Sequence, residues 1–141
     1  MIAYFDTSAL IPLLVAEPSS SPCSRLWNDA TRVMSSRLIY PEARAALAQA
    51  ERMRRLTVAE LGKAVEDLKS IAMEIDYLEV TADLAASAGD LAQAHGLRGY
   101  DAVHLASAAL VNDAELVLAT GDRDLGSAAR TIGISVALTT R

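Results

Sequence analysis

Acidic residues follow two apolar segments of this chain at the point where each segment ends. Asp6 comes directly after the apolar run 2–5, and Asp122 follows the run 115–119 after two intervening residues. In an open parallel sheet, ligands bind beyond the carboxyl ends of the strands, so acids in these places can meet at one edge. An Asp at either place also has an ordinary explanation as a turn or helix-capping residue.

Two further carboxylates lie in the first turns of predicted helices. Glu42 opens an alanine-rich helical segment, and Asp101 opens the helical segment that ends near Val111. The positive end of the helix dipole favours an anion in such a place, which by itself explains each residue. Taken together with Asp6 and Asp122, however, these acids are expected to converge on one groove.

The chemistry of such a groove favours a hard divalent cation. Carboxylates within ~4 Å of one another repel by about 4 kcal/mol per pair at an effective dielectric of 20, and a bound cation relieves this repulsion. Oxygen-rich clusters suit Mg²⁺ or Mn²⁺. A zinc site is poorly supplied, because Cys23, His95 and His104 are scattered along the chain.

The segments that carry these acids alternate between strand-like and helix-like patterns. Short apolar runs near residues 2–5, 32–36, 75–80, 115–119 and 134–138 predict strands, and helical segments separate them. This alternation predicts an α/β fold in which a parallel sheet of four to five strands has helices on both faces. The length of 141 residues predicts a single domain, residues 1–141.

Polar residues mark where the predicted helices begin. Thr7 or Ser8 is expected to cap a short helix after the first strand. Thr57 and Glu60 have the spacing of a capping box, and we expect the helix that they open to form a hairpin with the helix over residues 41–55.

The composition is that of a compact globular protein, with 52% hydrophobic and 22% charged residues. The single cysteine cannot form a disulfide within the chain, and no stretch is long enough to span a bilayer, so we expect a cytoplasmic protein. The net charge of -5 opposes binding to phosphates unless the acids bind divalent cations, which would invert the local field.

Three blocks with a common order and spacing extend this interpretation. They are FDTSAL at residues 5–10, YDAVHLA at 100–106 and LATGDRDL at 118–125, with Glu42 between the first two. Over essentially the whole chain they resemble the PIN-domain ribonucleases, specifically the VapC-type toxins of bacterial type II toxin-antitoxin pairs. The resemblance implies a PIN-like three-layer fold and an endoribonuclease that cleaves phosphodiesters with metal-activated water and leaves a 5′-phosphate.

The same resemblance assigns roles to individual residues. The implied catalytic and metal-binding residues are Asp6, Glu42, Asp101 and Asp122. Asp124 is an alternative or additional ligand at the fourth position. The hydroxyls that the resemblance implies as supporting contacts belong to Thr7, Ser8 and Thr120.

Several residues near these acids have two interpretations. His104 lies three residues after Asp101 and either approaches the site or is a packed, hydrogen-bonded histidine. Arg98 either orients a phosphate or is an ordinary exposed arginine. The basic cluster at Arg52, Arg54 and Arg55 either contacts RNA or interacts favourably with a helix C-terminus.

The partners that the resemblance implies are an RNA substrate and a VapB-type antitoxin. A flexible antitoxin segment is expected to fold on binding and to insert an Arg or Lys among the carboxylates. A homodimer is expected through the alanine-rich helices around residues 43–50 and 102–109.

Other protein classes with acids at strand ends fit less well. Phosphatases with an Asp nucleophile need a second Asp two residues on, where this chain has Ser8, and a receiver domain needs a Lys after a late strand. The remaining alternative is a catalytically inactive PIN-fold module that binds RNA or protein. Because all four acidic positions carry carboxylates, the sequence favours the enzyme.

Overall fold

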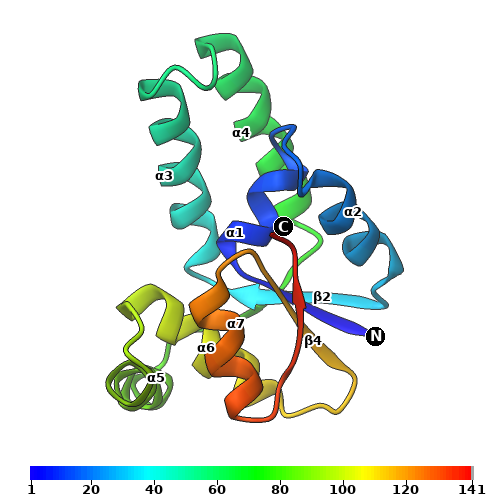
Figure 1. The fold of residues 1–141 in the computed structure, drawn as a ribbon. Coiled ribbons are helices and arrows are strands. Elements are labelled where there is room, and N and C mark those ends of the chain that lie inside the picture. The colour runs from blue at the N-terminus through cyan, green and yellow to red at the C-terminus, as the bar shows by residue number, and fades with distance from the viewer. Residues whose placement is uncertain (141) are drawn as a thin grey trace.

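A five-stranded parallel sheet forms the centre of the computed structural model, which describes residues 1–140 (Figure 1). The strands are β1 (Ile2–Phe5), β2 (Arg32–Ser36), β3 (Asp76–Leu78), β4 (Leu116–Thr120) and β5 (Ser135–Leu138), in the spatial order β3-β2-β1-β4-β5. The predicted parallel sheet of four to five strands is therefore confirmed. Arg141, the last residue of the predicted domain 1–141, lies outside the described residues.

Helices cover both faces of this sheet, as predicted. They are α1 (Thr7–Leu10) with the 3-10 turn η1 (Ile11–Leu13), α2 (Ser20–Asp29), α3 (Ile39–Arg52), α4 (Val58–Ala72), α5 (Ala82–His95), α6 (Gly99–Val111) and α7 (Arg123–Thr131). Because side chains alternate along a strand, Ala3 and Phe5 of β1 pack with α1 to α4, whereas Tyr4 packs with α6 and α7. No helix within residues 1–140 is long and apolar enough to cross a membrane.

The predicted helix start at Thr57 is confirmed, and so is the predicted hairpin. Thr57 and Glu60 each accept a hydrogen bond from the backbone N–H of the other, and α3 and α4 lie side by side (Figure 1). The first helix of the pair ends at Arg52, short of the predicted residue 55, because Arg54 has a left-handed backbone with φ of 60°.

The cap of the first helix differs from the prediction. Asp6, and not Thr7 or Ser8, is the N-cap of α1, because Thr7 is already helical while Asp6 keeps the extended backbone of the strand. The Asp6 side chain accepts a hydrogen bond from the backbone N–H of Ala9 at 3.0 Å. The strand therefore ends and the helix begins at Asp6, and the capping hydrogen bond fixes the direction of its side chain.

Candidate active site

A cleft of about 620 Å³ lies at the carboxyl ends of β1 and β4, where the sequence places two of the acids. Four of the predicted site residues line it with their carboxylates: Asp6, Glu42, Asp101 and Asp122. Thr7 and Ser8 line it as well, whereas Asp124 is an exposed residue of α7 outside this lining. The expected convergence on one groove is confirmed for the four acids.

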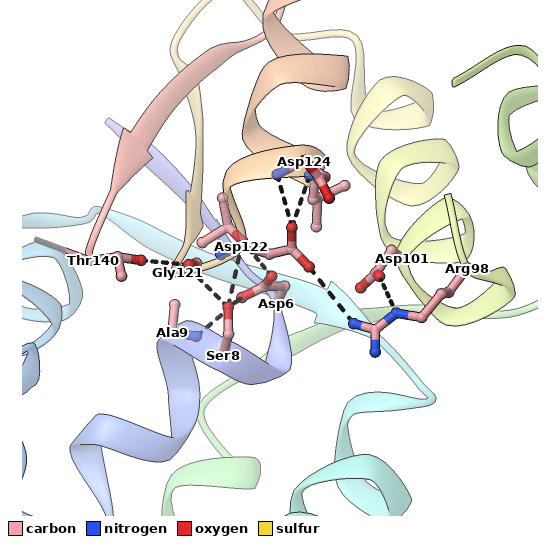
Figure 2. Close-up of polar contacts among 11 residues, drawn as sticks. Asp6, Ser8, Ala9, Arg98, Asp101, Gly121, Asp122, Asp124 and Thr140 are labelled. Atoms are coloured by element: carbon pink, nitrogen blue, oxygen red, sulfur yellow. Dashed lines mark hydrogen bonds and ion pairs between the residues drawn. The ribbon is translucent and has the colours of Figure 1, made fainter. Parts of the chain in front are cut away.

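The carboxylate of Asp6 is buried and accepts hydrogen bonds on both oxygens. Ser8 Oγ donates to Oδ1 at 2.7 Å, and Thr120 Oγ1 donates to Oδ2 at 2.5 Å, in addition to the bond from Ala9 (Figure 2). Burial raises the pKa of Asp6, although these hydrogen bonds and the nearby His104 act in the opposite direction. Asp6 is thus a strongly oriented carboxyl group that has no ion pair with a Lys or Arg among the described residues.

The predicted supporting hydroxyls connect β1 with the segment after β4. Thr120 Oγ1, which donates to Asp6, also accepts from the backbone N–H of Asp122 at 3.0 Å. Ser8 Oγ likewise accepts from the backbone N–H of Gly121 at 2.8 Å. The hydroxyl of Thr7 is buried and has no hydrogen-bond partner within residues 1–140.

Asp122 divides its two carboxylate oxygens between different roles. Oδ1 caps α7 by accepting from the backbone N–H groups of Asp124 and Leu125 at 2.9 and 3.0 Å. Oδ2 lies 3.6 Å from Nη2 of Arg98. The ordinary capping explanation is therefore correct for Asp122, and it leaves one oxygen facing the cleft.

Arg98 connects the last two acids. Its Nε donates to Oδ2 of Asp101 at 3.1 Å, so one guanidinium contacts the carboxylates of both Asp101 and Asp122 (Figure 2). The hydrogen bond to Asp101 and the charges of both acids raise the pKa of Arg98, which keeps it cationic. Neither interpretation left open by the sequence, a phosphate ligand or an ordinary exposed arginine, included this pairing.

Glu42 is held by a buried chain of polar side chains that the sequence did not reveal. His104 Nε2 lies 2.7 Å from Oε1 of Glu42, and His104 Nδ1 lies 2.8 Å from the hydroxyl of Tyr4. A carboxylate accepts, so Nε2–H donates to Glu42, and in a neutral imidazole Nδ1 then accepts from the phenol of Tyr4, whose pKa is raised by burial. His104 is packed and fully buried, as the ordinary interpretation requires, and it also orients a cleft carboxylate.

The basic cluster at the end of α3 is divided by the fold. Arg55 lines the cleft, whereas Arg52, the last residue of α3, lies outside the lining and donates a hydrogen bond to the side chain of Gln49. Arg55 and Arg98 are thus the two arginines of the cleft lining, and Arg98 is the one that contacts two of its acids.

Each cleft acid is turned toward a partner within the protein. Within residues 1–140, no three Asp, Glu, His or Cys side chains are grouped so as to hold a metal ion. The donor set nevertheless fits Mg²⁺ or Mn²⁺, because it consists of carboxylate oxygens on one cleft and because Asp101 and Asp122 already contact a single cationic group. A metal would have to take over the contacts that Arg98 makes.

Comparisons with known proteins agree with this geometry. The family model for the PIN domain matches residues 3–131. Ribonuclease VapC45 of Mycobacterium tuberculosis (strain CDC 1551 / Oshkosh) is 48% identical over 136 residues, which cover 96% of this chain and 94% of the relative. Ribonuclease VapC49 of the strain ATCC 25618 / H37Rv of the same species has the same identity and coverage.

Two solved structures show the same fold at lower sequence identity. The crystal structure of PAE2754 from Pyrobaculum aerophilum matches with a TM-score of 0.72 and 24% identity, covering 96% of this chain and 92% of the other. A toxin-antitoxin complex from Klebsiella pneumoniae contains a chain that matches with a TM-score of 0.69 and 20% identity, covering 99% and 98%. On the family model and the 48% identical relatives, this chain belongs to the PIN domain family, in its VapC branch.

Proposed function

We propose that this chain, as a single PIN domain, is a metal-dependent endoribonuclease and the toxin of a toxin-antitoxin pair. The observation that carries the proposal is the cleft at the sheet edge, where four segments far apart in the sequence each supply a carboxylate. The 48% identity to Ribonuclease VapC45 supports RNA as the substrate.

The residues that would hold Mg²⁺ or Mn²⁺ are Asp6, Glu42, Asp101 and Asp122. When bound, a divalent cation supplies positive charge that favours ionisation of an attacking water and stabilises the negative charge developing on the phosphate. Asp124, which the sequence kept as an alternative fourth ligand, is less suited, because it lies outside the cleft lining while Asp122 turns Oδ2 into it.

The protein's own contribution is to position these acids. Three hydrogen bonds fix the carboxylate of Asp6, and His104 fixes that of Glu42 from a fully buried position. A carboxylate held in this way loses little further freedom when it binds a ligand, which favours binding and orientation. Thr120 keeps Asp6 and the segment around Asp122 in register.

The substrate would approach from the open side of the cleft, where Arg55 and Arg98 lie. Guanidinium groups match the geometry of phosphate oxygens, so these two residues are the proposed contacts to the RNA backbone. Single-stranded loops are the expected target, because their unstacked bases and backbone are accessible.

A cleavage assay with controlled metal content tests the proposal. Purified chain is incubated with structured RNA in Mg²⁺, in Mn²⁺ and in excess chelator, and the 5′ ends of the fragments are sequenced after ligation that requires a 5′-phosphate. We expect cleavage with either metal and none with chelator. RNA binding without cleavage under all three conditions would indicate the alternative, an inactive PIN-fold binding module.

We further propose an antitoxin partner of the VapB type that occupies the same cleft. The acidic lining favours a segment that inserts an Arg or Lys, and the fold is shared with a chain of a toxin-antitoxin complex from Klebsiella pneumoniae. Such a segment and the metal would compete, each lowering the other's apparent affinity. Calorimetric titration of a purified antitoxin segment with and without Mn²⁺ checks this, and equal affinities would place the inhibitor elsewhere.

A homodimer is the assembly that we propose. In the folded chain the alanines 102, 106 and 108 of α6 are buried against neighbouring elements, so the predicted contribution of residues 102–109 is largely used within the chain. One apolar hollow that remains available lies beside the cleft, where Tyr100 is 63% exposed near Pro41 and Ala45 of α3. Light scattering of wild type and Ala45→Glu checks the proposal, and a monomeric mass for wild type at micromolar concentration contradicts it.

A further inference from the structure

Arg98 lies where two carboxylates of the cleft meet, although most of its side chain faces solvent. Its side chain is 82% exposed, whereas the side chains of Asp101 and Asp122 are 17% and 25% exposed. Figure 2 shows the guanidinium reaching toward both acids from the start of α6. The cation is thus the exposed member of the group, and the anions are the sheltered ones.

Asp122 is the most strongly anchored of the three side chains, because its Oδ1 accepts from two backbone N–H groups of α7. Asp101 lies within the first turn of α6, and its carboxylate accepts from Arg98. Arg98 is fixed only at its backbone, where its carbonyl oxygen accepts from the N–H of Ala102 at 3.0 Å. Within residues 1–140 its guanidinium contacts the two acids, and it can leave them by rotation about its own side-chain bonds.

The exchange of this arginine for a divalent cation is physically favourable. Exposed ion pairs stabilise weakly, and a released arginine regains rotamer freedom. A divalent ion brings twice the charge and coordinates oxygen directly. In the absence of metal, the guanidinium offsets the repulsion between the two carboxylates.

We infer that Arg98 is a tethered counter-ion: it holds Asp101 and Asp122 in place in the metal-free protein and competes with the divalent cation for them. The inference rests on the proposed function in one respect, because it takes these acids as metal ligands. Arg98 is therefore a positioning residue. The more strongly it pairs with Asp101 and Asp122, the higher the metal concentration that the enzyme requires.

Metal affinity provides a readout that is independent of RNA cleavage. Mn²⁺ is titrated calorimetrically into the metal-free full chain of wild type, Arg98→Ala, Arg98→Lys and Arg25→Ala. Arg25 is the matched control, because it is an exposed arginine of α2 that donates a hydrogen bond to Ser21, and Arg25→Ala changes the net charge equally.

Arg98→Ala is expected to bind Mn²⁺ on the order of fivefold more tightly than wild type, which corresponds to the loss of two weak ion pairs. Arg98→Lys should remain closer to wild type because it keeps the charge, and Arg25→Ala should be indistinguishable from wild type. In thermal unfolding, Arg98→Ala should melt at a lower temperature without metal and gain more from added Mn²⁺.

The outcomes separate this inference from the proposed function. If all four proteins bind Mn²⁺ with the same affinity, or if Arg98→Ala binds it more weakly, the counter-ion role is overturned while the metal site stands. If none of the four binds Mn²⁺, the metal site of the proposed function and the inference are both overturned.

Discussion

The two sides of the cleft hold their carboxylates by different means. On the buried side, Asp6 is 3% exposed and accepts hydrogen bonds from two neutral hydroxyls and one backbone N–H. On the open side, Asp101 and Asp122 share the cation of an exposed arginine. Within residues 1–140, the buried side is therefore oriented without a compensating Lys or Arg, and the open side is compensated by a group that can move away.

This difference bears on the proposed metal site, because the two sides would present their carboxylates to a cation in different ways. A buried anion without a cation costs free energy, so the folded protein must supply hydrogen bonds that fix it in place. A partly exposed pair of anions costs less and can be satisfied by an exchangeable side chain. Glu42 is intermediate, because the donor that holds it is an imidazole buried behind it.

If Asp6 on the buried side is a fixed ligand of the proposed metal site, Asp6→Asn should have the largest effect on RNA cleavage. Asn keeps the helix cap but removes the charge, so RNA cleavage should fall by at least about a hundredfold, because residues that only orient metal ligands already cost about 10- to 100-fold. Single-turnover cleavage measures this loss, and circular dichroism checks that the variant is folded. Activity within a factor of a few of wild type would remove Asp6 from the proposed metal site.

Thr120→Val separates the orientation of Asp6 from its charge. The substitution removes the hydroxyl that connects Asp6 to the backbone of Asp122, so cleavage should fall by about 10- to 100-fold while the acids remain. Thr139→Val is the control, because Thr139 is also buried at this end of the sheet but its hydroxyl has no hydrogen-bond partner among the described residues. Equal losses in the two variants would show that the effect comes from packing.

The fold and the acids of the site were predictable for related reasons. Strand and helix periodicity depends on neighbouring residues, so the order of the elements follows from local patterns. The carboxyl ends of parallel strands meet at one edge, which brings Asp6 and Asp122 to one cleft without knowledge of any contact. The cap of α1 was assigned one or two residues too late, because Asp6, which lines the cleft, is also the residue that caps the helix.

The partners of these acids were not predictable from sequence. Tyr4 and His104 are 100 residues apart, and His104 and Glu42 are 62 apart, so no local pattern connects them. Arg98 lies three residues from Asp101, a spacing that favours pairing on a helix, but its contact with Asp122 depends on how α6 and α7 meet. A buried tyrosine in β1 was a usable signal, since its hydroxyl needs a hydrogen-bond partner.

The pH dependence of stability tests, in the metal-free protein, how the buried side of the cleft differs from the open side. Burial raises the pKa of Asp6, so the folded state binds this proton more readily than the unfolded state does. Stability therefore rises as pH falls through the folded-state pKa toward the unfolded-state pKa, and above the folded-state pKa the ionised Asp6 destabilises the fold. Asp6→Asn should be more stable than wild type at neutral pH, with a difference that shrinks on acidification.

Urea unfolding of both proteins in chelator, from about pH 7 to about pH 4, measures this difference directly. Added Mn²⁺ should reverse the order at neutral pH, because the metal binds wild type more tightly than Asp6→Asn. A stability difference that stays constant over the whole pH range would show that burial of the Asp6 charge has no energetic cost.

The smallest effect is expected from an ion pair that has the same kinds of charged group as the open side of the cleft but lies outside the cleft. Lys63 Nζ lies 2.7 Å from Oδ1 of Asp67 one helical turn further along α4, with side chains 76% and 44% exposed. Solvent screens such a pair, and the cation precedes the anion, which is the less favourable order relative to the helix dipole. Lys63→Ala should therefore change the free energy of unfolding by only about 0.3 to 0.5 kcal/mol, within the range of exposed helical pairs.

Lys63→Ala should also leave Mn²⁺ affinity unchanged, unlike Arg98→Ala, because the carboxylate that it releases contacts solvent and does not line the cleft. Chemical denaturation and calorimetry on the two variants in parallel test the comparison, and a shift in metal affinity for Lys63→Ala would show that net charge, rather than the position of Arg98, controls the site.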